Sequence, residues 1–145
     1  MEHQEYNAKI AWLKRYKLAK AAERRLHERL CEARLKSFGV SAMSGARCQT
    51  MRGQSGVERA AERISRAENE LAAQTERRKC LYAETMRAII RLQGQNQRRV
   101  LKYRYIDGLH MEEIARRMEI SSRWARQLHK QAIMALDTSA PTGYN

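Results

Sequence analysis

Proline, aromatic residues and long apolar runs are scarce in this 145-residue sequence. The single proline is Pro141, and aromatic side chains make up only 6% of the residues. Because an internal proline breaks or kinks a helix, its absence before position 141 permits long helices over most of the chain. Leu, Ala, Arg, Glu, Lys and Gln, which all favour helices, dominate the composition. The sequence therefore predicts an all-α fold.

Metal-binding, membrane-spanning and catalytic motifs are also missing. No apolar run is long enough to span a bilayer, and residues 1–6 lack the apolar core of a secretory signal. Cys31, Cys48 and Cys80 lie far apart, without the close spacing that zinc sites need. No phosphate-binding loop, HExxH motif or nucleophile elbow indicates an enzyme, and His110 and His129 have no catalytic partner nearby in the sequence. We expect a non-enzymatic, cytoplasmic protein with free thiols, no metal, no cofactor and no membrane contact.

Positive charge is what the sequence has in excess. The formal net charge is +13 at pH 7. A chain this basic favours a polyanionic partner, most often nucleic acid. Residues 1–37 carry ten basic and five acidic side chains, and residues 94–145 carry nine and five. The basic excess is therefore spread along the chain, and the first helix is a second candidate for contact with DNA or with an acidic partner.

Two long helices are predicted before residue 94. Residues 5–37 and 57–92 carry apolar side chains at helical spacing. The first stripe consists of Tyr6, Ile10, Leu13, Leu26, Leu30 and Ala33, with Trp12 and Tyr16 beside it. The second stripe consists of Val57, Ala61, Ile64, Leu71, Tyr82, Ile89 and Leu92, interrupted by Glu68, Thr75, Arg78 and Thr85.

The segment between these helices, residues 38–56, holds four of the seven glycines and is predicted to be a loop. We expect residues 1–93 to form an antiparallel helical hairpin. Interrupted heptads favour a hairpin or a partner contact over an uninterrupted two-stranded coiled coil. Whether the stripes are buried only within the hairpin, or also form a homodimer interface, stays open at this point. Residues 138–145 are expected to be a disordered tail.

Residues 94–137 have the pattern of a helix-turn-helix. Gly94 marks a break, Asn96 is the predicted N-cap of the next helix, and Gly108 is predicted to follow its last turn. A short helix is predicted next, and it is followed by a turn at Glu119 and Ile120. A second helix, with Ser121 as its N-cap, follows the turn. The inward side chains predicted for the two helices are Ile114, Ala115, Met118, Ala125, Leu128, Ala132 and Leu136.

This segment resembles region 4 of bacterial RNA polymerase sigma factors. The resemblance rests on Arg99 to Gly108, on Glu113-Ile114-Ala115, on Ile120-Ser121 and on Leu128 to Leu136. Glu119 departs from the pattern, which usually has glycine at the turn. In layout the whole chain is similar to small phage-encoded proteins with a long helical N-terminal part. The resemblance implies a phage or prophage transcription regulator that binds double-stranded DNA in the nucleoid.

The second helix of the motif is the predicted recognition helix, whose outward side chains enter the major groove. Arginine can contact guanine and glutamine can contact adenine through paired hydrogen bonds. The predicted DNA-binding residues on this helix are Ser121, Ser122, Arg123, Arg126, Gln127 and Lys130. Arg98, Arg99, Lys102, Arg116 and Arg117 are either phosphate contacts or ordinary surface charges. Trp124 is expected to be partly exposed and to pack on the preceding helix.

The sequence also permits two functions other than that of a DNA-binding regulator. Sigma region 4 binds both promoter DNA and polymerase, so the resemblance also permits an adaptor that docks on RNA polymerase. A helix-turn-helix occurs as well in the DNA-recognition subunits of phage packaging terminases, which are basic and helical. We do not expect a full sigma factor, because we find no promoter-melting or −10-reading region beside the predicted helical hairpin.

Overall fold

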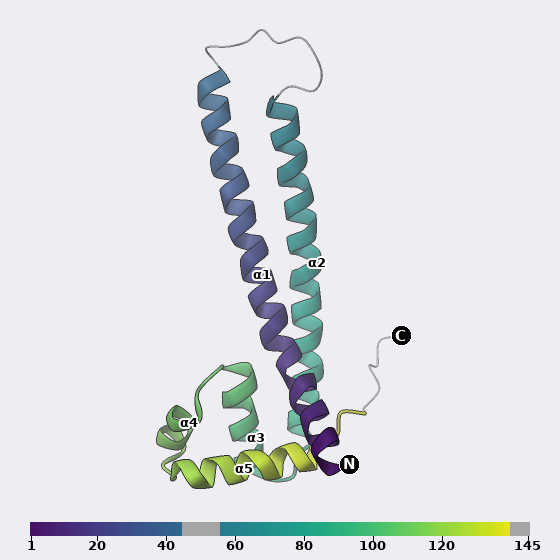
Figure 1. Cartoon of the computed structure of the whole chain (residues 1–145), viewed down its shortest axis with the longest axis vertical. Coiled ribbons are helices and arrows are strands. Elements are labelled where there is room, and N and C mark those ends of the chain that lie inside the picture. Colours follow the sequence, from purple (N-terminus) through teal and green to yellow (C-terminus); the bar gives the residue numbers. More distant parts are fainter. Residues whose placement is uncertain (45–55, 140–145) are drawn as a thin grey trace. The chain divides into compact units, whose positions relative to one another are not determined.

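The computed structural model describes residues 1–44 and 56–139, and these residues form helices and no strand. The all-α prediction is confirmed. Two long helices, α1 (Glu2–Ser44) and α2 (Gly56–Ile90), precede three shorter ones, α3 (Gln95–Leu101), α4 (Met111–Met118) and α5 (Ser122–Ala135) (Figure 1). A π-helical turn, η1 (Lys102–Ile106), continues α3 directly. Within the described residues, no helix combines the length and apolarity that would let it cross a membrane.

The first helix is longer than the sequence predicted. Residues 38–44, expected to begin a loop, are the last two turns of α1. Glycine costs a helix only about 1 kcal/mol relative to alanine, so Gly39 does not end the helix as a proline would. The rest of the predicted loop, like most of the predicted tail, lies outside the described residues. The second helix begins and ends within two residues of its predicted limits.

The described chain packs as two compact units. Unit 1 consists of residues 1–19 and 78–145, and unit 2 consists of residues 20–77. In each unit a part of α1 and a part of α2 run antiparallel beside each other. The predicted division of the chain into a hairpin of residues 1–93 and a helix-turn-helix of residues 94–137 stays a prediction.

Unit 1 contains nearly all of the buried apolar side chains. Its main cluster joins both long helices to the C-terminal helices through Leu13, Ala88, Ile89, Leu92, Leu101, Tyr105, Ala132, Ile133 and Leu136. Two expectations for the long helices are wrong here. Tyr16, placed beside the stripe, is buried with Ala19 and Leu81, whereas Tyr82, placed in the stripe, is 40% exposed. The pairing with α3 and α5 turns the α2 core toward Leu81, Thr85 and Ile89, one position away from Tyr82.

The boundaries of α3 differ from the prediction at one end and agree at the other. The N-cap is Gly94, in an extended conformation, and not Asn96. A β-carbon at Gly94 would lie 3.1 Å from the Gln97 side chain, which folds over this end of the helix. After η1, Gly108 has φ +74° and Leu109 donates its N–H to the Tyr103 carbonyl at 2.9 Å. Gly108 therefore ends the helix in the left-handed conformation, as predicted.

Candidate nucleic-acid interface

The turn between α4 and α5 has the geometry of a helix-turn-helix. The Glu113 carboxylate accepts a hydrogen bond from the His110 N–H at 3.2 Å and so caps the start of α4. At the other end, Glu119 adopts the left-handed conformation, with φ 57° and ψ 43°. Ile120 then donates its N–H to the Ala115 carbonyl at 3.0 Å and closes the turn. Glu119 thus occupies a conformation that costs a side-chain-bearing residue about 1–2 kcal/mol.

Helix α5, the second helix of the motif, begins at the predicted cap. Ser121 Oγ accepts a hydrogen bond from the Trp124 N–H at 3.1 Å. All four side chains predicted to face inward, Ala125, Leu128, Ala132 and Leu136, are at most 5% exposed. Ile133 is also fully buried, although the sequence pattern did not identify it. A second cluster of Val100, Ile114 and Leu128 holds α3, α4 and α5 together.

The opposite face of α5 is exposed and polar. Arg123, Gln127 and Lys130 follow one another at steps of four and three residues, which places them on one line along the helix. Arg126 lies beside this line, and all four side chains are exposed. Ser122 is half-buried at the start of the helix. The structure therefore brings Arg123, Arg126, Gln127 and Lys130 onto a single accessible face.

Arg126 is linked to the first helix of the motif. Its Nη2 lies 3.0 Å from Glu112 Oε1, and both side chains are more than 60% exposed. An ion pair this exposed contributes less than about 1 kcal/mol. A phosphate or a base edge can therefore compete with Glu112 for Arg126 at little cost.

The remaining predicted basic residues have different surroundings. Arg99, Lys102, Arg116 and Arg117 are exposed, and the Arg117 guanidinium lies 5.9 Å from the centre of the Tyr103 ring. Arg98 is neither a free surface charge nor directed at a ligand. It donates hydrogen bonds to the Leu92 and Gln93 carbonyls and so caps the end of α2. Trp124 keeps 41% of its surface exposed, in agreement with the expected partial exposure, and its packing on the preceding helix stays a prediction.

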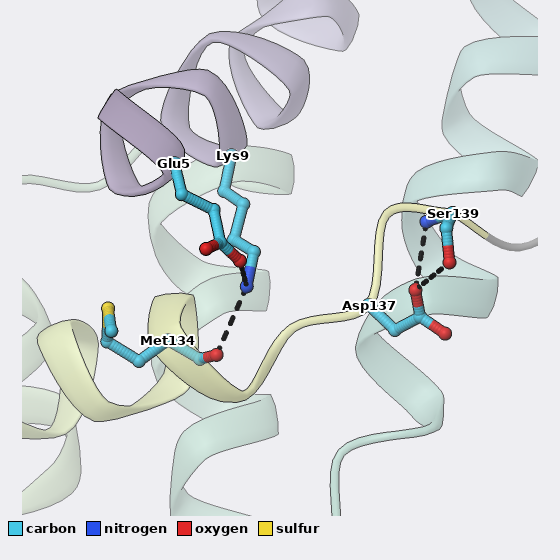
Figure 2. A network of polar contacts seen from close by, with 5 residues as sticks. All are labelled: Glu5, Lys9, Met134, Asp137 and Ser139. Atoms are coloured by element: carbon cyan, nitrogen blue, oxygen red, sulfur yellow. Dashed lines mark hydrogen bonds and ion pairs between the residues drawn. The ribbon is translucent and has the colours of Figure 1, made fainter. Parts of the chain in front are cut away.

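The start of α1 contacts the end of α5 through Lys9, which sequence reasoning did not anticipate. Lys9 Nζ donates a hydrogen bond to the Met134 carbonyl at 3.2 Å and forms an ion pair with Glu5 at 3.0 Å. Figure 2 shows the Lys9 side chain between its two partners. In the same view the Asp137 carboxylate accepts hydrogen bonds from Ser139, which lower the pKa of Asp137. No local sequence signal could have placed Lys9 there, because 125 positions separate it from Met134.

A tyrosine–histidine pair connects η1 to α5. The Tyr105 hydroxyl and His129 Nε2 lie 2.8 Å apart, and the two rings are stacked with centres 5.7 Å apart. Burial, and secondly the charge of Arg104, lower the pKa of His129 to about 4. Burial also raises the pKa of Tyr105 to about 12. At neutral pH both groups are uncharged, so the pair joins η1 to α5 and adds no charge to the interface.

Groups that could serve another chemistry are not assembled. Among residues 1–44 and 56–139, no three His, Cys, Asp or Glu side chains are placed to hold a metal ion. Cys31 and Cys80 are exposed thiols, while Cys48 lies outside the described residues. The interface of α3, α4 and α5 is therefore the candidate site that the fold builds most completely.

Comparison with known proteins agrees with this geometry. Residues 94–137 match the family model described as sigma-70, region 4. No curated protein and no solved structure matches the chain. The matched segment begins at the N-cap of α3 and ends just after α5. The chain therefore contains a sigma-region-4-like helix-turn-helix.

Proposed function

We propose that this protein is a DNA-binding transcription regulator whose helix α5 lies in the major groove of double-stranded DNA. The observation that carries the proposal is the two-sided character of α5. One side is fixed in the core by Ala125 and Ala132, both fully buried. The other side presents Arg123, Gln127 and Lys130 to solvent. A helix anchored in the core on one side and polar on the other supports direct contact with base edges.

Different residues have different tasks in this proposal. Arg123 and Gln127, on the first two turns of α5, contact bases, because paired hydrogen bonds from these side chains distinguish guanine and adenine. Arg126 joins them by exchanging Glu112 for DNA. The phosphate backbone is contacted by basic and hydroxyl side chains around this face. We assign that role to Ser121, Ser122, Lys130, Arg99, Lys102, Arg116 and Arg117.

The decisive experiment compares substitutions on α5 with one outside the motif. The preferred site is first selected from random double-stranded DNA and then used for binding measurements at fixed salt. Arg123→Ala and Gln127→Ala are each expected to weaken specific binding by about 1–3 kcal/mol, with relaxed preference at one position. Arg66→Ala, which removes an exposed arginine of α2, is the matched control and should change affinity far less. If neither α5 substitution alters affinity or preference, α5 is not the recognition helix.

The origin and the cellular context are finer parts of the same proposal. A phage or prophage regulator in the bacterial cytoplasm fits the sequence resemblance and the basic composition. Docking on RNA polymerase is the competing use of the same domain. Polymerase retained by the protein without DNA, and unaffected by Arg123→Ala, would favour the adaptor.

A further inference from the structure

Unit 2 buries little of its apolar surface. Among its described residues, Leu30 is the single buried apolar side chain. Leu35, Phe38 and Val57 are exposed by 73%, 78% and 53%. Two helices alone can cover only the seam between them, and stable domains need a second packed layer. The two helices of unit 2 therefore do not form a complete hydrophobic core by themselves.

The exposed apolar side chains of unit 2 share one side of the hairpin. At about 100° per residue, Cys31 and Phe38 project from the same side of α1 as Arg34, and Leu35 lies at the outer edge of that side. On α2, Val57, Ala61 and Ala72 project from the same side as Glu68. Arg34 and Glu68 form an ion pair at 3.1 Å across the seam, so the two sets lie on one surface. The name apolar face is used below for six residues of this surface: Cys31, Leu35, Phe38, Val57, Ala61 and Ala72.

A shallow groove of about 440 Å³ continues this face along the seam. Leu30, Leu71, Ala72 and Thr75 line it, with Arg34, Glu68 and Glu76 at its edges. The opposite side of the hairpin has another character. It carries a row of exposed cations, here called the basic face: Arg25, Arg29, Lys36, Arg59, Arg63, Arg66 and Arg77. A partner that covers apolar surface is thus restricted to one side.

We propose that the apolar face of unit 2 binds the same face of a second copy of this chain, and that the two hairpins form a four-helix bundle. Charge favours this occupant. Near the apolar face, α1 carries Arg24 and Arg34, whereas α2 carries Glu68 and Glu76. A two-fold axis parallel to the helices places α1 of one copy over α2 of the other. Opposite charges then meet, and the basic faces point outward on both sides.

The size of the face suits such a dimer. About 22 residues of α2 lie in unit 2, which at a rise of about 1.5 Å per residue gives a paired length of about 33 Å. Two helices, each about 10 Å wide, then offer on the order of 700 Å² per copy. Specific protein interfaces bury about 800 Å² per partner. The bundle also supplies the layer that Leu35, Phe38 and Val57 lack.

The test measures the mass of the full chain in the absence of DNA. Sedimentation equilibrium should show a concentration-dependent dimer of the 16.9 kDa chain. The double variant Leu35→Ser/Phe38→Ser should weaken self-association at least tenfold. The matched control is Leu18→Ser/Ile90→Ser, which alters two side chains of unit 1 that are 66% and 63% exposed. This control should dimerise like the unaltered protein. A monomer at every concentration, or equal effects of both double variants, would overturn the proposal.

A cross-linking experiment locates the interface without altering the apolar residues. With Cys48→Ser in the background, the remaining thiols are Cys31 on the apolar face and Cys80 in unit 1, both exposed. The proposed two-fold axis places the two Cys31 thiols on helices that lie diagonally across the bundle, so the reagent must be a bismaleimide with a long flexible spacer. It should yield a covalent dimer that persists after Cys80→Ser and is lost after Cys31→Ser. The reverse pattern would place the contact in unit 1 and contradict the proposal. Neither readout depends on DNA binding, so failure here and failure of the proposed function are distinguishable.

Discussion

Unit 1 and unit 2 are both built from parts of the same two long helices, yet they bury very different amounts of apolar surface. In unit 1, α3, η1 and α5 pack on α1 and α2 and leave Leu13, Leu101 and Ile133 without solvent contact. In unit 2, the same helices have only each other, and the described part buries only Leu30 among its apolar side chains. The comparison shows that a long amphipathic helix gains most of its stability from the layers packed on it, and much less from its own pattern.

The largest expected effect contrasts leucines in the two units. Leu101→Ala removes a fully buried side chain from unit 1 and should lower the free energy of unfolding by roughly 2–5 kcal/mol. Urea unfolding followed by tryptophan fluorescence measures this, because Trp12 and Trp124 both lie in unit 1. Leu71→Ala, at a half-buried site of unit 2, should change that transition by less than about 1 kcal/mol. Equal losses would mean that the two units do not differ in packing as described.

A smaller change, this time an increase in the free energy of unfolding, is expected when Thr85 is replaced by valine. Its side chain is fully buried in unit 1, and its hydroxyl has no hydrogen-bond partner among the described residues. Replacing a buried unpaired hydroxyl by a methyl group removes a desolvation penalty of about 1–3 kcal/mol. Thr85→Val should therefore raise the unfolding free energy by about 1 kcal/mol in the same assay. Thr75→Val, at a half-buried position of unit 2, is the control and should be nearly neutral. Destabilisation by Thr85→Val would show that the hydroxyl is satisfied.

Acid should weaken unit 1 through His129. The pKa of His129 is lowered from its usual value of 6.5 to about 4 in the folded protein. Below pH 6.5 the unfolded chain therefore binds a proton that the folded chain does not, and stability falls as the pH falls toward 4. Allowing for partial solvent screening, the loss between pH 7 and pH 5 is about 1 kcal/mol. Thermal unfolding at both pH values measures it, and His129→Gln should flatten the dependence. An unchanged slope in that variant would exclude His129 as the cause.

The smallest expected effect concerns the turn of the helix-turn-helix. Glu119 has φ 57°, a conformation that glycine adopts without strain. Glu119→Gly should stabilise unit 1 by up to about 1 kcal/mol, because the relief of strain exceeds the added freedom of the unfolded chain. Arg116→Gly, within α4, is the opposite control and should cost about 1 kcal/mol. Calorimetry of the two variants checks both signs, and a loss in Glu119→Gly would mean that its side chain makes a compensating contact.

The helix-turn-helix was more predictable than the hairpin for a physical reason. Its inward residues, its Ser121 cap and its Gly108 ending are local signals, since each acts on residues three or four positions away. The errors occurred where distant segments compete for one helix. Arg98 was interpreted as a surface charge or a phosphate contact, but it caps α2 from the following helix. Tyr16 and Tyr82 exchanged their expected places because α3 and α5 determine which side of the long helices is covered.

By itself, the sequence determined the helical class, the basic character and the position of the helix-turn-helix. These three properties depend on composition and on the spacing of residues within one helix. Because a helix has 3.6 residues per turn, the spacing in the sequence shows which residues share a face. The tertiary structure decided which helix faces become core and which stay exposed. It brought Lys9 to the end of α5, buried His129 beside Tyr105, and left Phe38 uncovered. Burial is a property of what packs against a side chain, and that partner lies far away in the sequence or, for unit 2, in a second copy of the chain as we propose.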